Sequence, residues 1–256
     1  MRIGLRVNEP QYLQLMLDRL PPGWKPAVSP VVVNMYSLLL SRNSPSTNVR
    51  RFSLLYAGGI RAARSLDHDL VLKVFESDIQ IYVGILARRR IFVHAGVVEW
   101  KGQAIVIPGR SMSGKSTLTA ALVRAGATYY SDEYAVLDEQ GRVHAYPRLL
   151  GLRSPGTDEQ TKVRAEELGG RVGSKPLPVG MVVVSQYHEG ARWRPRKLTP
   201  GQGALEVLAN TVPARTRPEE SLTSIQQAVT KASIFKGRRG DAKETAHLIL
   251  ESLSRS

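Results

Sequence analysis

One stretch of nine residues constrains the fold of this chain more than any other feature. It reads Gly109-Arg110-Ser111-Met112-Ser113-Gly114-Lys115-Ser116-Thr117 and matches the pattern G-x-x-x-x-G-K-[ST] at every position. A β-rich run, Gln103 to Ile107, precedes it, and a helix-forming run, Leu118 to Ala125, follows it. Between a strand and a helix, such a loop turns its backbone N–H groups inward and adds the positive end of the helix dipole. The sequence therefore predicts a phosphate-binding loop.

Two side chains of this loop suit a nucleoside triphosphate and its metal ion. Lys115 can reach the β- and γ-phosphates as a point charge, and the Ser116 hydroxyl is placed to ligate Mg²⁺. We therefore expect all nine loop residues to contact the nucleotide, with ATP and Mg²⁺ as the cofactors.

A pair of acidic residues supplies the oxygen ligands that Mg²⁺ requires. Asp132-Glu133 ends a strand predicted for Ala127 to Tyr130. In a sheet of parallel strands the carboxyl ends meet at one edge, so we expect both acids near the phosphates. Asp132 would orient Mg²⁺ together with Ser116, and Glu133 would accept a proton from an attacking hydroxyl.

His94 is a further candidate, in the apolar run Phe92-Val93-His94-Ala95-Gly96. A single histidine in an apolar strand is more often a hydrogen-bonded core residue than a catalytic one. Its position in the run therefore does not assign it a role.

The charge balance favours an anionic partner. Lys and Arg number 36 against 22 Asp and Glu, which gives a net charge of +14. The local basic clusters are Arg88 to Arg90, Arg192 to Lys197 and Lys236 to Arg239. Aromatic residues are only 6% of the chain, so stacking platforms for nucleic acid are scarce and we do not expect nucleic-acid binding.

Composition also bounds the class of protein. The chain has no cysteine, which excludes disulfides, thiolate metal sites and a cysteine nucleophile. No stretch reaches the roughly 18 apolar residues of a membrane span, and residues 1–20 lack the apolar segment of a signal peptide. We expect a cytoplasmic protein with no membrane partner.

We expect two regions, an N-terminal α/β region over 1–90 that packs on a core over 91–256, which holds the glycine loop and the C-terminal helices. Hairpins are expected over Ile91–Val98 with Gln103–Ile107, and over Tyr134–Leu137 with Val143–Tyr146. Ser154–Pro178 reads as a loop or lid. The other expected strands are Val31–Leu40, Val179–Tyr187 and Trp193–Leu198. The other expected helices are Pro10–Leu20, Asp67–Arg90 with Arg88–Arg90 in its last turn, Glu159–Leu168, Gly203–Asn210, Glu219–Ser233 and Asp241–Ser252.

Four motifs together resemble the HPr kinase/phosphorylase family, and more closely the shorter HPr-kinase-like proteins of the phosphoenolpyruvate-carboxykinase superfamily. They are His94-Ala95-Gly96, the glycine loop, Tyr130-Ser131-Asp132-Glu133 and Pro147-Arg148-Leu149, so the likeness covers roughly residues 90–155. The resemblance implies an α/β fold in which a mixed β-sheet carries the phosphate loop, with flanking helices. It also implies transfer of phosphate from ATP to a serine hydroxyl of a protein, with His94 supporting the catalytic acid.

The chain departs from the family pattern at three points. The second acid of the family is an aspartate, whereas Glu133 stands here, so the base is either Glu133 or Asp132. No match to the family's second Mg²⁺-binding glutamate occurs between Leu149 and Gly180, which argues against a phosphorylase activity. The family's N-terminal domain also has no counterpart, so HPr is not the expected substrate; shorter relatives act on serine in precursor peptides such as those of lasso peptides.

The resulting hypothesis is a serine kinase for a peptide or small protein, with an acidic acceptor suited to the positive charge. Arg148 and Arg153 follow the acid pair and could neutralise charge on the transferred phosphoryl group, or simply face solvent. Two alternatives remain: a kinase for a small-molecule hydroxyl, and a regulatory protein that senses a nucleotide or binds nucleic acid without transfer. The sequence leaves homo-oligomerisation open.

Overall fold

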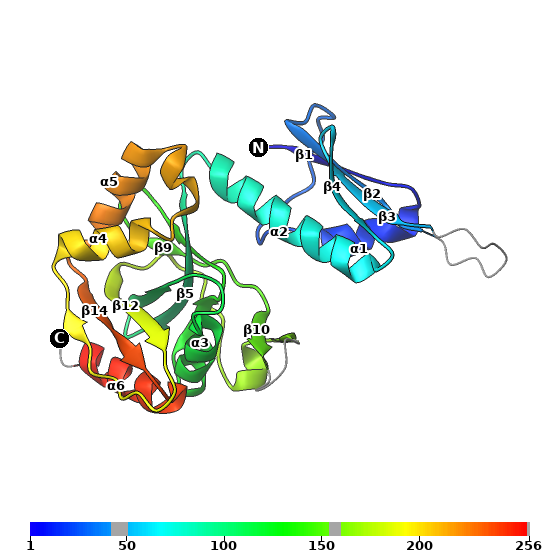
Figure 1. The fold of residues 1–256 in the computed structure, drawn as a ribbon. Coiled ribbons are helices and arrows are strands. Elements are labelled where there is room, and N and C mark those ends of the chain that lie inside the picture. The colour runs from blue at the N-terminus through cyan, green and yellow to red at the C-terminus, as the bar shows by residue number, and fades with distance from the viewer. Residues whose placement is uncertain (42–50, 154–159, 255–256) are drawn as a thin grey trace. The chain divides into compact units, whose positions relative to one another are not determined.

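The computed structural model describes residues 1–41, 51–153 and 160–254 and divides into two compact units, Met1–Ala87 and Arg88–Ser256 (Figure 1). The N-terminal unit contains β1 (Ile3–Val7), a 3-10 turn (Pro10–Tyr12), α1 (Leu13–Leu17), β2 (Asn34–Leu39), β3 (Ser53–Ala57), β4 (Ile60–Ser65) and α2 (His68–Leu86). Its sheet has the order β1-β2-β3-β4, with β1 parallel to β2 and the other pairs antiparallel.

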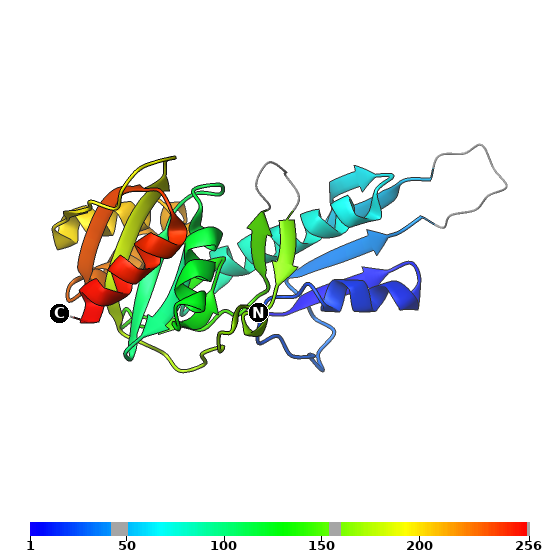
Figure 2. The same ribbon diagram turned by 90° about the horizontal axis from the view of Figure 1, so that it is seen from below.

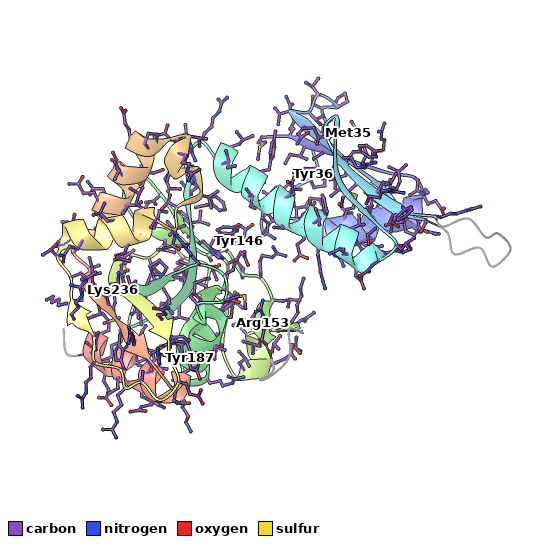
Figure 3. All side chains as sticks on the ribbon, in the orientation of Figure 1. Met35, Tyr36, Tyr146, Arg153, Tyr187 and Lys236 are labelled. Carbon is purple, nitrogen blue, oxygen red and sulfur yellow. The ribbon has the colours of Figure 1, made fainter. Side chains whose placement is uncertain are left out.

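Alternating residues of this sheet pack against the two helices. Tyr36 and Leu38 of β2 are fully buried with Phe75 of α2 and Met16 of α1 (Figure 3). The Tyr36 hydroxyl donates a hydrogen bond to Asp78 Oδ2 at 2.6 Å. The expected strand over 31–40 is present in shorter form, and the β3–β4 hairpin was not predicted. The expected helix over 10–20 is α-helical only over the five residues of α1.

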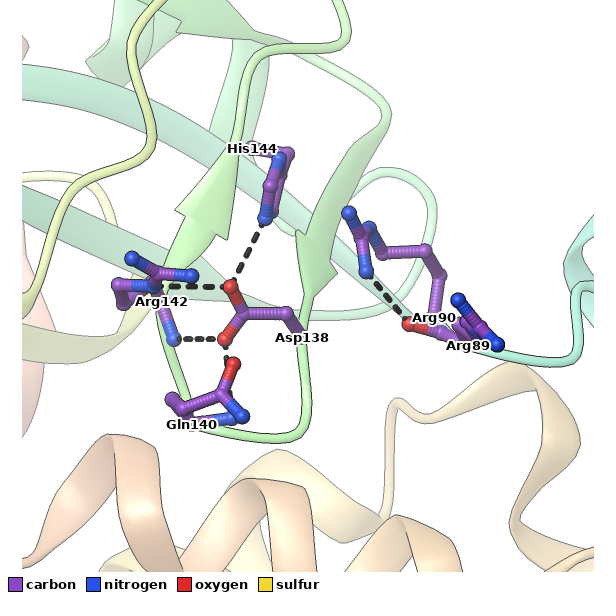
Figure 4. Close-up of polar contacts among 6 residues, drawn as sticks. All are labelled: Arg89, Arg90, Asp138, Gln140, Arg142 and His144. Atoms are coloured by element: carbon purple, nitrogen blue, oxygen red, sulfur yellow. Dashed lines mark hydrogen bonds and ion pairs between the residues drawn. The ribbon is translucent and has the colours of Figure 1, made fainter.

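Helix α2 begins and ends at different points from those expected. The Asp67 side chain caps its start by accepting the N–H groups of Asp69 and Leu70. It ends at Leu86, so Arg88–Arg90 lie beyond it and no basic residue occupies its last turn, which corrects the expectation that these arginines end the helix and face the negative end of its dipole. The next strand begins at Ile91, which is buried. Arg90 Nη1 instead donates to the Arg89 carbonyl (Figure 4).

The C-terminal unit is built on an eight-stranded mixed sheet of order β13-β14-β12-β6-β5-β8-β9, with β7 also paired to β5. Its strands are β5 (Ile91–Trp100), β6 (Gln103–Pro108), β7 (Thr128–Ser131), β8 (Tyr134–Leu137), β9 (Val143–His144), β12 (Val179–Tyr187), β13 (Arg196–Lys197) and β14 (Ser233–Arg239). A separate hairpin joins β10 (Leu150–Arg153) and β11 (Gln160–Val163). The helices are α3 (Lys115–Arg124), α4 (Pro200–Leu208), α5 (Pro218–Val229) and α6 (Ala242–Ser254), with 3-10 turns at Glu166–Leu168 and Val212–Arg215.

Helices cover both faces of this sheet (Figures 1 and 2). One apolar core lies between the sheet and α4 with α5, and the other lies between the sheet and α3 with α6. The mixed α/β architecture that was expected is therefore present. Among the described residues, no helix combines the length and apolar character that a bilayer span demands.

The predicted β5–β6 and β8–β9 hairpins are both confirmed as antiparallel pairs. The first turns at Lys101-Gly102, where both residues have positive φ, as a two-residue hairpin turn requires. Helix α3 ends before Gly126, whose φ of 101° suits the left-handed end of a helix. The glycines of this segment therefore indicate in the sequence where the hairpin turns and where the helix ends.

Strand order around the acid pair differs from the parallel arrangement that was expected. Strands β7 and β8 form one almost continuous line antiparallel to β5, interrupted only at Asp132-Glu133. Strand β6 pairs with the other side of β5, also antiparallel, so β6 and β7 run in the same direction with β5 between them. The glycine loop and the acids therefore follow strands on either side of β5, at the same end of the sheet.

The segment between β10 and β12 is not the free loop that was expected. Residues 154–159 of the predicted loop, and Glu159 of the predicted helix, lie outside the described part of the chain. Gln160–Val163 is a strand, and only Glu166–Leu168 is helical, as a single 3-10 turn. Backbone hydrogen bonds tie Gly173 to Tyr129 and Leu177 to Val143, because pairing with β7 and β9 satisfies this polar backbone.

Two further corrections concern the edge of the sheet. The strand expected over Trp193–Leu198 is reduced to Arg196–Lys197. Strand β14 was not predicted, although it pairs in parallel with β12 along seven residues. The three helices expected after Leu198 are present as α4, α5 and α6.

Candidate nucleotide site

The glycine loop connects β6 to α3, in the strand–loop–helix setting that the motif requires. Its entry is tied to β5, because Gly109 N–H donates to the His94 carbonyl at 3.2 Å. Its exit needs glycine, since Gly114 has a φ of 85° and begins α3 in the left-handed conformation. Met112 also has positive φ, at 66°, and its side chain is exposed. The loop is therefore a chain of tight turns that ends on the free N–H groups of a helix.

The other loop residues differ in their exposure. Arg110, Ser111 and Thr117 are exposed, whereas Ser116 is half-buried in the first turn of α3. The Ser113 hydroxyl is buried and has no hydrogen-bond partner within the described segments of the chain. A buried hydroxyl without a partner costs free energy, so this orientation favours a ligand atom at the loop.

Lys115 lies over the loop and not in solvent. Its residue is 7% exposed, and its ammonium group donates to the Arg110 carbonyl at 2.9 Å. Burial lowers the pKa of Lys115, while the negative charges of Asp132 and Glu133 oppose the shift. The side chain therefore holds a positive charge between the loop and the two acids.

Asp132 is the acid with the most unusual surroundings. The residue is 9% exposed, and its Oδ2 accepts the Gly151 N–H at 3.3 Å. Oδ1 is buried and lacks a hydrogen-bond partner in the part of the chain that the structure covers. Burial raises the pKa of Asp132 to about 7, against the opposing effects of the nearby Ser116 hydroxyl, the Gly151 N–H and the Lys115 charge. A cation beside Oδ1 would relieve this cost.

Glu133 lies next to His94 and is more accessible than Asp132. The Glu133 side chain is 45% exposed, and its Oε1 is 3.8 Å from His94 Nε2. The Glu133 carbonyl accepts Ala95 N–H at 3.1 Å, which fixes the backbone of the acid beside β5. Burial, helped by the Lys115 charge, lowers the pKa of His94 to about 4. His94 is therefore a neutral imidazole at neutral pH and does not form a charged pair with Glu133 there.

A cluster of aromatic rings borders this side of the site. Tyr134 packs edge-to-face on Phe92 and Tyr146, with ring centroids 5.5 and 5.6 Å apart, and its ring lies 6.0 Å from that of His94. The Arg148 charge acts on both Tyr134 and Tyr146, so this arginine lies near the acid pair. Arg153 is exposed on β10 (Figure 3).

The donor set fits a magnesium ion that is held partly by its nucleotide. Within the described ranges, no group of three or more His, Cys, Asp or Glu residues could enclose a metal by itself. Ser116 and the free Oδ1 of Asp132 offer two oxygen ligands at one place. Mg²⁺ keeps several waters and binds through one or two protein oxygens plus phosphate, so two ligands are enough.

Comparison with known proteins adds little to this geometry. No protein-family model matches the sequence, and no curated protein matches it. Among solved structures, the chain is similar to the Hpr(Ser) kinase/phosphatase from Coxiella burnetii at 15% identity and a TM-score of 0.31. The match covers 64% of this chain and 93% of that chain. A likeness at this level carries no functional argument, so the chemistry must come from the residues themselves.

Two groups at the site were not identified from the sequence. Gly151 N–H holds Asp132 from β10, and Arg239 at the end of β14 donates to the Gly114 carbonyl at 2.6 Å. A backbone N–H leaves no signal in side-chain patterns. Arg239 was noted only as part of a basic cluster, because nothing in its neighbours shows that it is buried.

Proposed function

We propose that the C-terminal unit is an ATP- and Mg²⁺-dependent kinase that transfers the γ-phosphoryl group to a hydroxyl, most specifically to serine in a peptide or small protein. The observation that carries this proposal is the buried, unpartnered oxygen of Asp132 beside Ser116 and Lys115 at the start of α3. A buried carboxylate whose pKa is raised and whose oxygen faces a phosphate loop is suited to a metal–nucleotide complex.

The residues of the loop would bind and orient the triphosphate. The N–H groups at the start of α3 would donate to the phosphate oxygens, and Lys115 would move its ammonium group from the Arg110 carbonyl to the β- and γ-phosphates. Mg²⁺, held by Ser116 and Asp132, would neutralise charge on the phosphates. Arg148, whose charge acts on Tyr134 and Tyr146, would add positive charge on the acceptor side.

The two acids differ in a way that supports separate roles. Asp132 is buried and hydrogen-bonded to Gly151, so its oxygen is fixed for a ligand role. Glu133 is almost half exposed, so an acceptor hydroxyl can approach it. We therefore assign Glu133 as the group that accepts the hydroxyl proton. Neutral His94 would position the Glu133 carboxylate without altering its charge.

The test is transfer of labelled phosphate from γ-labelled ATP, with Mg²⁺, to serine-containing peptides encoded by neighbouring genes. Lys115→Ala is expected to abolish transfer, because the triphosphate loses its main cation. Lys231→Ala, an exposed lysine after α5, is the matched control and should retain activity. Retained transfer in Lys115→Ala would refute the assignment, and tight MgATP binding with no transfer to any hydroxyl would favour the nucleotide-sensing alternative.

The two acid roles are separated by Glu133→Gln. This variant should lower kcat by roughly 10²–10⁴-fold, the usual contribution of a general base, while MgATP binding measured by calorimetry stays unchanged. Asp132→Asn should weaken MgATP binding as well. If Glu133→Gln weakened MgATP binding and kept its kcat, the roles of the two acids would be reversed.

A further inference from the structure

Arg239 is the largest side chain in the described chain that has almost no contact with solvent. The residue is 1% exposed, at the carboxyl end of β14. A buried guanidinium group is costly unless its surroundings compensate for the lost hydration. A surface arginine has no such cost, so the burial of Arg239 requires an explanation.

The contacts of Arg239 centre on the phosphate loop. Nη2 donates to the Gly114 carbonyl at 2.6 Å, and Nη1 donates to the Gly240 carbonyl at 3.2 Å. Nε is buried and has no hydrogen-bond partner among residues the structure places. The guanidinium carbon lies 5.6 Å from the centroid of the Tyr187 ring, at the end of the neighbouring strand β12 (Figure 3). Strands β12 and β14 thus extend past β6 and bring Arg239 against the loop.

Gly114 is shaped to accept this contact. A Cβ atom at position 114 would lie 2.3 Å from Arg239 Nη2, closer than real atoms approach. Position 114 therefore needs glycine for two separate reasons, its positive φ and the space that the guanidinium group occupies. The close approach is between the loop backbone at Gly114 and the buried end of the Arg239 side chain.

The bonded carbonyl belongs to the peptide unit whose N–H is that of Lys115. This N–H is among those that a helix leaves unpaired at its start. The same carbonyl also accepts Leu118 N–H at 3.1 Å, so two donors hold the peptide plane. A charged donor on a carbonyl polarises the N–H at the other end of that peptide unit and makes it a stronger donor.

We propose that Arg239 is a positioning residue of the phosphate site, which fixes and polarises the Gly114–Lys115 peptide so that its N–H binds a nucleotide phosphate; this role rests on the nucleotide binding proposed above. The chemistry recognised is the phosphate of a nucleoside di- or triphosphate. Arg239 acts through the backbone of the loop, from behind it, and does not touch the ligand.

Binding of MgATP and MgADP to the full chain, measured by calorimetry, tests this role. Arg239→Met keeps most of the side-chain volume and removes the charge and both donors, and it should weaken both nucleotides by about tenfold, the value of one charge-assisted hydrogen bond. Arg239→Lys restores the charge and one donor and should recover part of the affinity. Arg238→Met, an exposed neighbour on the same strand, is the control and should bind as the wild type does.

A purely structural role predicts a different pattern. In that case Arg239→Met would lower the melting temperature, while the folded protein at low temperature would bind both nucleotides with wild-type affinity, and this result would overturn the proposal. If Arg239→Met does not fold, ¹⁵N spectra of arginine side chains in the wild type decide the matter. MgADP should shift the Arg239 guanidinium signals and leave those of Arg238 in place; unmoved Arg239 signals at saturation would equally overturn it.

Failure of this role is distinguishable from failure of the proposed function. A wild-type protein that binds no nucleotide refutes the kinase proposal itself. If the wild type and folded Arg239→Met bind MgATP equally tightly, only the role of Arg239 is refuted.

Discussion

Two buried aspartates lie in neighbouring turns of the C-terminal unit and differ in how their oxygens are satisfied. Asp138, after β8, is 3% exposed and accepts hydrogen bonds from Gln140 N–H, Arg142 N–H, Arg142 Nε and His144 Nε2, at 2.9–3.0 Å (Figure 4). Asp132, after β7, accepts a hydrogen bond from Gly151 N–H and has the Ser116 hydroxyl nearby, while its buried Oδ1 makes no well-formed hydrogen bond among the described residues.

The pKa shifts of the two carboxyls follow this difference. Burial by itself would raise the pKa of Asp138, but the hydrogen bonds from His144 and Arg142 outweigh it and hold the pKa below its ordinary value. Burial raises the pKa of Asp132 to about 7, because its few partners do not compensate. The comparison distinguishes a carboxylate that stabilises a turn from one that the fold leaves available to a ligand.

The largest expected effect separates the two aspartates by activity. Asp132→Asn removes the proposed anionic metal ligand and should reduce phosphoryl transfer by about 10³-fold, since such a ligand supports several kcal/mol of charge stabilisation. Asp138→Asn is the matched control, and its folded fraction should transfer phosphate at the wild-type rate. Equal losses of activity in the two variants would remove the functional distinction.

The second-largest expected difference between Asp132 and Asp138 is in how each affects the pH dependence of the free energy of unfolding. In the folded protein Asp132 keeps its proton up to about pH 7, whereas in the unfolded chain it loses it near pH 4. Its contribution to the free energy of unfolding therefore falls as pH rises from about 4 to 7, by roughly 4 kcal/mol in total. Asp132→Asn, without nucleotide, should be the more stable protein at pH 8, as urea titrations at several pH values would show. A wild type that lost no stability relative to Asp132→Asn over this range would contradict the raised pKa.

The pH dependence of the free energy of unfolding should have the opposite sign for Asp138, and the loss of stability should be smaller. Its lowered pKa means that its stabilisation is present at neutral pH and is lost only as pH falls below about 4. Asp138→Asn should cost about 2 kcal/mol at pH 7, the usual worth of hydrogen bonds to a charged group. The check is a urea titration at pH 7, and an unchanged midpoint would show that the turn does not depend on this carboxylate.

The smallest expected effect tests how much the Arg142 side chain contributes to the hydrogen bonds of Asp138. The Arg142 side chain is 51% exposed, so its ion pair with Asp138 is well solvated. Arg142→Met should therefore cost less than about 1 kcal/mol, because the backbone N–H of residue 142 still donates to the carboxylate. Thermal unfolding measures this difference. A loss as large as that of Asp138→Asn would mean that the side-chain pair dominates.

The sequence predicted the parts of the site that have local signals. The glycine loop, Lys115 and the acid pair belong to short motifs, and the structure brings the loop lysine and both acids close enough to affect each other's charge. The β5–β6 turn and the end of α3 were also predictable, because positive φ selects glycine there. Such features depend on a few consecutive residues.

The parts that were missed depend on tertiary contacts. Strand β14 reads Ser-Ile-Phe-Lys-Gly-Arg-Arg, and its basic residues and glycine hide the pattern of a strand that is stabilised by pairing with β12. The burial of Arg239 cannot be read locally, since arginine is usually exposed. The end of α2 at Leu86 was missed because no glycine or proline marks it. The role of Asp132 as the less accessible acid likewise follows only from its burial.

The placement of β5 between β6 and β7 acts as an internal spacer between the glycine loop and the acid pair. Neighbouring strands in a sheet lie about 4.8 Å apart, so the two strands that deliver the phosphate loop and the acids are held roughly 10 Å from each other. Backbone hydrogen bonds from Gly109 to His94 and from Ala95 to Glu133 secure both sides of that spacer. The distance between the backbones of the loop and of the acids is thus set by the geometry of the sheet, and does not depend on which side chains β5 carries.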